Sequence, residues 1–164
     1  MNLMKIPFQP LKAGYGGEPA FGVSRIELAG GPGRYRATPE PQEHMLTASW
    51  LLQEHEYSAF MGFVRSVART GGAPFLADLI IDDAAVREYA ARIVPGTLRL
   101  VSIAGNVYTV SAQLEVESLP EVRDPSTDYW ASVILFLAVY GSVAAAREVW
   151  DLLAKLVNED LPHG

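Results

Sequence analysis

Three groups of residues in this chain carry side chains that could do chemistry, and two of them suggest a metal site. Glu54-His55-Glu56 and Asp82-Asp83 combine carboxylates with one imidazole, the oxygen and nitrogen ligands that divalent cations bind. No pair of histidines has the short spacing that places two ligands on one face of a helix or strand. We therefore favour a solvated helix start for the first group and a turn between strands for the second.

The third group, Gly30-Gly31-Pro32-Gly33-Arg34-Tyr35-Arg36, is a glycine-rich stretch with two arginines that could cradle a phosphate. Pro32 removes a backbone donor, and no clear helix follows to supply an N-terminus, so a flexible loop is favoured. Nucleophile-elbow and Walker-type motifs are missing from the sequence. We expect no catalytic residue, no metal ligand and no cofactor, and we do not expect an enzyme.

Composition indicates one folded protein and argues against nucleic-acid binding. The 164 residues are 49% hydrophobic and 20% charged, which is typical of a globular protein with a substantial core. The chain has no cysteine, which excludes disulfides and cysteine-based zinc sites. A net charge of −6 argues against sequence-specific nucleic-acid binding, which usually needs a basic surface.

The charge is uneven along the chain. Residues 1–36 hold five basic and two acidic side chains, whereas the remainder hold eight and seventeen. This polarity could align subunits head to tail, although we favour a simpler basic N-terminal arm. Met1–Pro7 has no apolar run long enough for a signal peptide. Trp130–Ala146 has no charge over 17 residues, and its glycine, serine and alanines favour a buried or subunit-facing helix over a membrane span.

The first half of the chain predicts an arm, a strand and a helix. Residues 1–44 are rich in Gly and Pro, and Phe21–Leu28 alternates as a strand would. Alternation over Met45–Leu52 predicts a half-buried strand with its even-numbered side chains on one face. Glu54–Thr70 has the 3, 4, 7 apolar spacing of an amphipathic helix, ended by Gly71-Gly72.

Four more strand patterns follow, and Val86–Val94 is ambiguous between helix and strand. We favour a strand because Pro95-Gly96 is expected to turn the chain into the next one. Gly105-Asn106 predicts a hairpin before a strongly alternating last strand. The four expected strands are Phe75–Ile81, Val86–Val94, Thr97–Ile103 and Val107–Val116.

The C-terminal part predicts two helices. Asp124-Pro125 is a helix-start signature, with a capping carboxylate before a proline, and the helix is expected to reach Tyr140. Gly141-Ser142 predicts a break before a second helix that ends near Asn158. The whole chain therefore predicts an α+β fold, with an arm over 1–44, a β core with one packed helix over 45–120, and a helical extension over 121–164.

The core pattern is familiar. The strand Thr47–Leu52, a helix containing Phe60-Met61-Gly62-Phe63-Val64, the turn Gly71–Phe75 and the closing strand Val107–Val116 follow one another. This order resembles the minor tail proteins of long-tailed phages, the lambda-type minor tail protein M and the wider distal tail protein group. Asp124–Gly164 has no counterpart in the compact lambda-type protein. The resemblance implies a β-sandwich or meander like that of tail-tube proteins.

The resemblance also implies a role. It implies a virion structural protein of the tail, assembled in the host cytoplasm, that forms a homo-oligomeric ring, a hexamer, joining the tail tube to the tip hub proteins. The family has no catalytic residues to transfer. The arm of residues 1–43 would reach a neighbouring subunit or ring. The expected subunit-interface residues are Trp130, Ile134, Leu137, Trp150, Leu153, Tyr108 and Val110.

Three alternatives remain from the sequence. The first is a non-viral oligomeric adaptor that dimerises through its C-terminal helices. The second is a membrane-associated protein anchored by residues 130–146. The third is an enzyme that uses the Glu54, His55, Asp82 and Asp83 group, because no other group combines metal-binding side chains.

Overall fold

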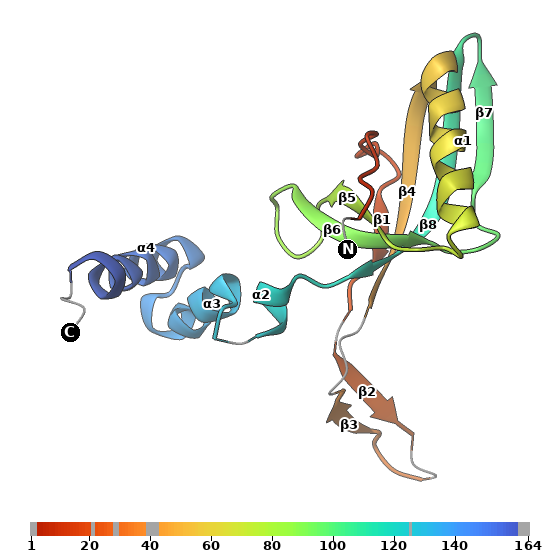
Figure 1. Ribbon diagram of the computed structural model, residues 1–164. Helices are drawn as coiled ribbons and strands as arrows, with labels where there is room; N and C mark the ends of the chain where they lie inside the picture. The colour runs from red at the N-terminus through yellow and green to blue at the C-terminus, as the bar shows by residue number, and fades with distance from the viewer. Residues whose placement is uncertain (1–2, 21, 28–29, 39–42, 125, 161–164) are drawn as a thin grey trace. The chain divides into compact units, whose positions relative to one another are not determined.

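The computed structural model describes residues 3–20, 22–27, 30–38, 43–124 and 126–160. It divides into two compact units, which we call the sheet unit (residues 1–118) and the helical unit (residues 119–164). Figure 1 shows the strands and helix α1 of the first and the helices of the second. The chain has the α+β fold that its sequence predicts. The elements are β1 (Gly16–Glu18), β2 (Val23–Ile26), β3 (Arg34–Ala37), β4 (Glu43–Gln53), α1 (Glu54–Arg69), β5 (Phe75–Leu79), β6 (Arg87–Ile93), β7 (Arg99–Ala104), β8 (Val107–Glu117), α2 (Pro120–Arg123), α3 (Tyr129–Tyr140), α4 (Val143–Lys155) and the π-helical turn η1 (Leu156–Asp160).

The sheet unit is built on β4 and β8, which pair antiparallel from Glu43 opposite Glu117 to Gln53 opposite Val107. The even-numbered residues of both strands share one face, as the alternation predicts. Opposite one another on that face lie the buried pairs Leu46 and Leu114, Ala48 and Ala112, and Trp50 and Val110.

Helix α1 covers this buried face, and Figure 1 shows it lying along β4 and β8. Phe60, Phe63 and Val67 recur at helical spacing and are its buried residues. The ring of Phe60 lies 5.1 Å from that of Trp50, and Phe63 meets Phe75 edge to face at 5.2 Å. Such ring pairs add to the burial of apolar surface, so α1 is held by aromatic packing.

On its other side, β8 pairs with two successive strands. Ala91–Ile93 of β6 pair with one end of β8, and Arg99–Ala104 of β7 pair with the other end, both antiparallel. Strands β6 and β7 therefore run in the same direction along one edge of β8. The predicted turn at Pro95-Gly96 is wrong, because the chain is interrupted there and does not reverse.

Thr97 closes this interruption. The Val94 amide donates to the Gln113 carbonyl at 2.9 Å before the chain leaves the ladder. After Gly96, with φ at +80°, the Thr97 hydroxyl oxygen accepts a hydrogen bond from the Gln113 amide at 3.1 Å. The same hydroxyl donates to the Val94 carbonyl at 2.7 Å. A side chain thus replaces a missing rung of the ladder, and the Val94 carbonyl and the Gln113 amide keep hydrogen-bond partners.

The N-terminal segment is part of the sheet unit. Ile6 is buried, and residues 4–6 pair in parallel with β5 through two backbone hydrogen bonds to Leu76. The Phe8 ring lies 6.0 Å from that of Phe60. Strand β1 pairs with β4 at Met45–Thr47. Between β1 and β4 the hairpin β2–β3 forms a separate two-stranded sheet. The predicted strand Phe21–Leu28 is shorter, and Phe21 and Leu28 lie outside the described residues.

The helical unit departs from the prediction at its start. Pro120 is the first residue of α2, and α3 begins at Tyr129, with the Asp128 carboxylate accepting from the Ala131 amide. The predicted start at Asp124-Pro125 is wrong at Asp124, whose carboxylate instead caps a turn at Ser126, and Pro125 lies outside the described residues. The predicted break at Gly141-Ser142 is confirmed.

Gly17 provides a test of how tightly β1 lies on β4. A Cβ added to Gly17 would lie 2.2 Å from the Met45 carbonyl oxygen, whereas a Cβ at Gly16 would contact nothing within 4 Å. We expect G17A to lower the free energy of unfolding by about 1–3 kcal/mol, because backbone must shift to relieve the overlap. G16A should change it by less than about 0.5 kcal/mol. Urea unfolding followed by tryptophan fluorescence measures both, and equal effects would contradict the close approach.

Candidate functional site

A buried polar cluster surrounds His44, which lies in β4 with 4% of its surface exposed. Its Nδ1 accepts a hydrogen bond from the Ala20 amide at 3.0 Å. Its Nε2 lies 2.9 Å from Ser118 Oγ and 3.3 Å from Asp82 Oδ1. Because Nδ1 accepts, the neutral ring carries its proton on Nε2, which then points at both oxygen atoms.

Tyr89 completes the cluster from β6. Its hydroxyl donates to Asp82 Oδ2 at 3.1 Å and accepts from the Asp82 amide at 3.2 Å. Burial, ahead of the nearby carboxylates, raises the pKa of Tyr89 to about 12. The hydroxyl therefore stays protonated at neutral pH and remains a donor to Asp82.

The types Ser, His and Asp suggest nucleophilic catalysis, but the geometry is different. In a catalytic triad the carboxylate and the nucleophile bind opposite ring nitrogens, so that Nε2 can take the serine proton. Here Asp82 and Ser118 share Nε2, and the Ala20 amide occupies Nδ1. The ring therefore has no lone pair directed at the serine. What the cluster does is hold three segments together: the start of the hairpin stretch, the loop after β5, and the end of β8.

The metal candidates of the sequence are engaged elsewhere. Glu56 accepts from the Gln53 amide at 2.8 Å and so caps α1, where His55 is exposed. Asp83 binds Arg87 at 2.8 Å, and its pKa is lowered, since its hydrogen bonds to the Ala85 amide and Arg87 outweigh the effect of burial. Over the part of the chain that the structure describes, no group of three or more histidine and acidic side chains could hold a metal ion.

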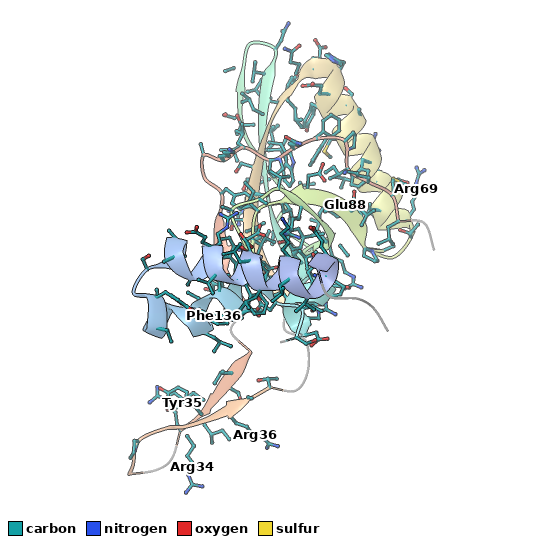
Figure 2. All side chains as sticks on the ribbon, turned by 90° about the vertical axis from the view of Figure 1, so that its left-hand side faces the viewer. Arg34, Tyr35, Arg36, Arg69, Glu88 and Phe136 are labelled. Atoms are coloured by element: carbon teal, nitrogen blue, oxygen red, sulfur yellow. The ribbon has the colours of Figure 1, made fainter. Side chains whose placement is uncertain are left out.

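The phosphate candidate forms part of the β2–β3 hairpin. Arg34, Tyr35 and Arg36 belong to β3 and are exposed, and Figure 2 shows their side chains projecting from the hairpin. The strand pairs with β2 as Arg25 opposite Tyr35. Among the described residues the next element after this hairpin is the strand β4, and no helix lies between them. The hairpin therefore offers a small cationic and aromatic surface in place of a phosphate cradle.

A shallow groove of about 280 Å³ lies beside β5. Pro10, Lys12, Tyr15, Ile80 and Val86 are among the residues that line it. The Tyr15 hydroxyl donates to the Ile80 carbonyl and accepts from the Ile80 amide, each at 3.0 Å. Burial raises the pKa of Tyr15. Its hydroxyl already serves as the partner of the strand end, and the surface of the groove is mostly apolar, with Gln9, Lys12 and Asp78 as its other polar residues.

The two interface candidates from β8 lie within the sheet unit. Val110 is 1% exposed, so its side chain is covered in this conformation. Tyr108 stacks on Tyr57 of α1 with ring centroids 4.5 Å apart. Both therefore help to hold α1 on the sheet.

The exposed apolar surface of the sheet unit is on β7 instead. Among the described strands β7 pairs only with β8, so its outer edge is open. Leu100 and Ile103 lie opposite Val110 and Tyr108, which places them on the face that α1 covers elsewhere. Leu100 is 46%, Val101 60% and Ile103 57% exposed. We call this surface the β7 edge. An open edge with apolar side chains is a common site of strand pairing between chains.

The remaining interface candidates lie in the helical unit, where they differ in exposure. Trp150 faces the α3–α4 contact, with its ring 5.7 Å from that of Phe136, which Figure 2 labels. Trp130 lies under the Arg147 guanidinium at 5.6 Å. Leu137 is half-buried, whereas Ile134 and Leu153 are exposed.

The sequence analysis missed the two most exposed large hydrophobic residues among the described side chains of α3. Leu135 is 79% and Val139 75% exposed. They are four residues apart and share a helix face with Ile134 close by. The signal was present in the sequence, because the uncharged run from Trp130 to Ala146 leaves α3 without any polar face.

No family model, curated protein or solved structure matches this chain at a significant level. None of the helices within the described ranges combines the length and the hydropathy needed to cross a membrane.

The His44 cluster predicts a large effect of one histidine and a small effect of another. H44F would leave the Ala20 amide and the Asp82 carboxylate without the ring nitrogens that they contact, and we expect it to lower the free energy of unfolding by about 2–4 kcal/mol. H55F makes the same exchange at an exposed position and should change stability by less than about 0.5 kcal/mol. Guanidinium unfolding measures both variants. Similar losses would show that His44 does not hold the three segments.

Proposed function

We propose that this protein is a structural subunit of a phage tail, of the minor or distal tail protein class, which forms a ring between the tail tube and the tip hub. The observation that carries the proposal is the β7 edge. On that side of the six-stranded sheet the outer edge of β7 is unpaired and carries three exposed large apolar side chains, as in a subunit whose sheet continues into a neighbour.

The β2–β3 hairpin supports contact with a second surface. Residues 22–38 hold Arg25, Arg34, Arg36 and one acidic residue, Glu27, so the hairpin carries a net charge of +2. The chain as a whole carries −6, which leaves −8 on the rest. A basic projection on an acidic protein favours contact with another copy or another acidic subunit.

The start of β4 and the end of β8, which lie side by side, offer such an acidic surface. A hydrogen bond between Glu43 and Glu115, together with burial, raises the pKa of Glu43. Glu117 lies opposite Glu43 in the β4–β8 ladder. Arg92 Nη1 lies 3.6 Å from Glu43 Oε1 and 3.7 Å from Glu117 Oε1. One arginine thus faces three carboxylates, and an added cation from a neighbouring hairpin would relieve their repulsion.

The alternative is an adaptor that dimerises through its C-terminal helices. The exposed apolar face of α3 favours it. The two functions differ in assembly size, because an adaptor would stop at a dimer, whereas a tail subunit would close a ring.

Assembly through the β7 edge can be tested with one charge. The wild-type protein is expected to form rings in negative-stain electron microscopy, with a matching mass by mass photometry. I103K should raise the dissociation constant of the ring at least about tenfold, because lysine on an edge strand opposes pairing. L51K is the matched control, since Leu51 is 53% exposed on the opposite face of β4, and it should leave the rings intact. A monomeric wild type, or equal effects of the two lysines, would contradict the proposal.

A further inference from the structure

Helix α3 has an unusual composition for the surface of a protein. Its twelve residues, Tyr129–Tyr140, include no charged side chain, and apolar residues occur all around it. A helix that is apolar on every side is normally covered on every side. Helix α4 is different, because it carries Arg147, Glu148 and Asp151 on one side.

One side of α3 lies against α4. Val133 and Ala146 are buried between the two helices, and Phe136 contacts Trp150 at 5.7 Å. At the rim of this contact the Tyr129 hydroxyl donates to Asp151 at 2.7 Å. This side of α3 therefore has its partner within the helical unit.

The other side of α3 is uncovered. It carries Ile134, Leu135 and Val139, which are 52%, 79% and 75% exposed. We call these three residues the α3 face. In the described part of the helical unit only Val133 and Ala146 are fully buried hydrophobic residues. So small a core rarely holds a helix pair together, which means that the α3 face needs a partner for stability.

We infer that the partner of the α3 face is a second copy of this chain, with α3 packed against α3 so that two helical units form a four-helix bundle. Such bundles are built from antiparallel helix pairs with apolar residues on their facing sides. A symmetric contact of this kind uses the same surface on both copies.

Charge favours a second copy over a different protein. The chain carries −6, so two copies repel each other at most surfaces. Helix α3 has no charged side chain, so two copies can meet along it without repulsion. It also carries no charged side chain that would recognise a charged partner, and specificity for a foreign protein often uses one.

The exposed area is of the right size. Ten large apolar side chains of the described helical unit are between 40% and 79% exposed. Together they present on the order of 1,000 Å² over α3, α4 and η1, and the five on α3 supply somewhat more than half of it, against about 800 Å² on each partner in a standard interface. The ten are Trp130, Ile134, Leu135, Val139, Tyr140, Val143, Leu152, Leu153, Leu156 and Val157.

Two glutamates test the contact in the full chain. L135E and V139E place a carboxylate in the centre of the α3 face. Each should raise the dissociation constant for self-association by about 100-fold or more, because the carboxylate would be buried against apolar side chains with no cation. Sedimentation velocity over a range of concentrations measures the change. A144E is the control, since Ala144 is exposed on α4 outside the α3 face, and it should associate like the wild type.

A thiol gives a second measurement that does not depend on tolerating a charge. The chain has no cysteine, so L135C, V139C and A144C each introduce a single thiol. Under mild oxidation L135C or V139C should give a disulfide-linked dimer, because a two-fold axis brings equivalent residues of α3 together. A144C should remain monomeric on a non-reducing gel.

The pairing does not require that the protein be a tail subunit, and the variants separate the two ideas. Loss of association in L135E but not in I103K supports the pairing and argues against assembly through the β7 edge, and the reverse result overturns the pairing. L135E and V139E that associate like the wild type overturn it as well, as does equal crosslinking of all three cysteine variants. Flotation of a non-associating wild type with phosphatidylcholine vesicles would identify lipid as the partner and would also overturn it.

Discussion

The ladder between β4 and β8 is the contact on which the rest of the sheet unit depends. It keeps one register over eleven pairs, so every even-numbered residue of both strands lies on the buried face against which α1 packs. A slip by one residue would turn Trp50 and Leu114 to the opposite face and expose them. The aromatic contacts of α1, the pairing of β1 and the position of His44 all follow from this register.

The same ladder explains why the apolar surface is concentrated on β7. Strand β8 has one free side for two strands, and β6 and β7 divide its length between them. The outer edge of β6 pairs with β5, and the outer edge of β5 pairs with residues 4–6. Strand β7, in contrast, has no partner on its outer edge among the described strands. Of the two strands beside β8, one is thus continued by further strand pairing within the chain, and the other has an open outer edge. The helical unit repeats this asymmetry, since α3 has a partner on one side only.

Local patterns predicted most of the elements but few of the contacts that join them. Alternation located β4 and β8, and helical spacing located α1, because each pattern follows from burial on one face. The turn at Pro95-Gly96 was wrong because a Pro-Gly pair is compatible with a break in pairing as well as with a reversal, and here both flanking strands pair with β8. The helix start was wrong because Asp124 and Asp128 are both good caps. The His44 cluster could not be predicted, since Ala20 and Ser118 lie 24 and 74 residues away.

The stretch between β1 and β4 has a consequence for how this protein could vary. Glu18 and Met45 are paired neighbours in the sheet, so the two ends of the intervening segment are fixed side by side. A segment attached in this way can change its length at a small cost in loop-closure entropy, without altering any pair of the ladder. The β2–β3 hairpin is therefore an exchangeable part, in which descendants of this chain could acquire a longer projection or a different binding surface while keeping the same sheet.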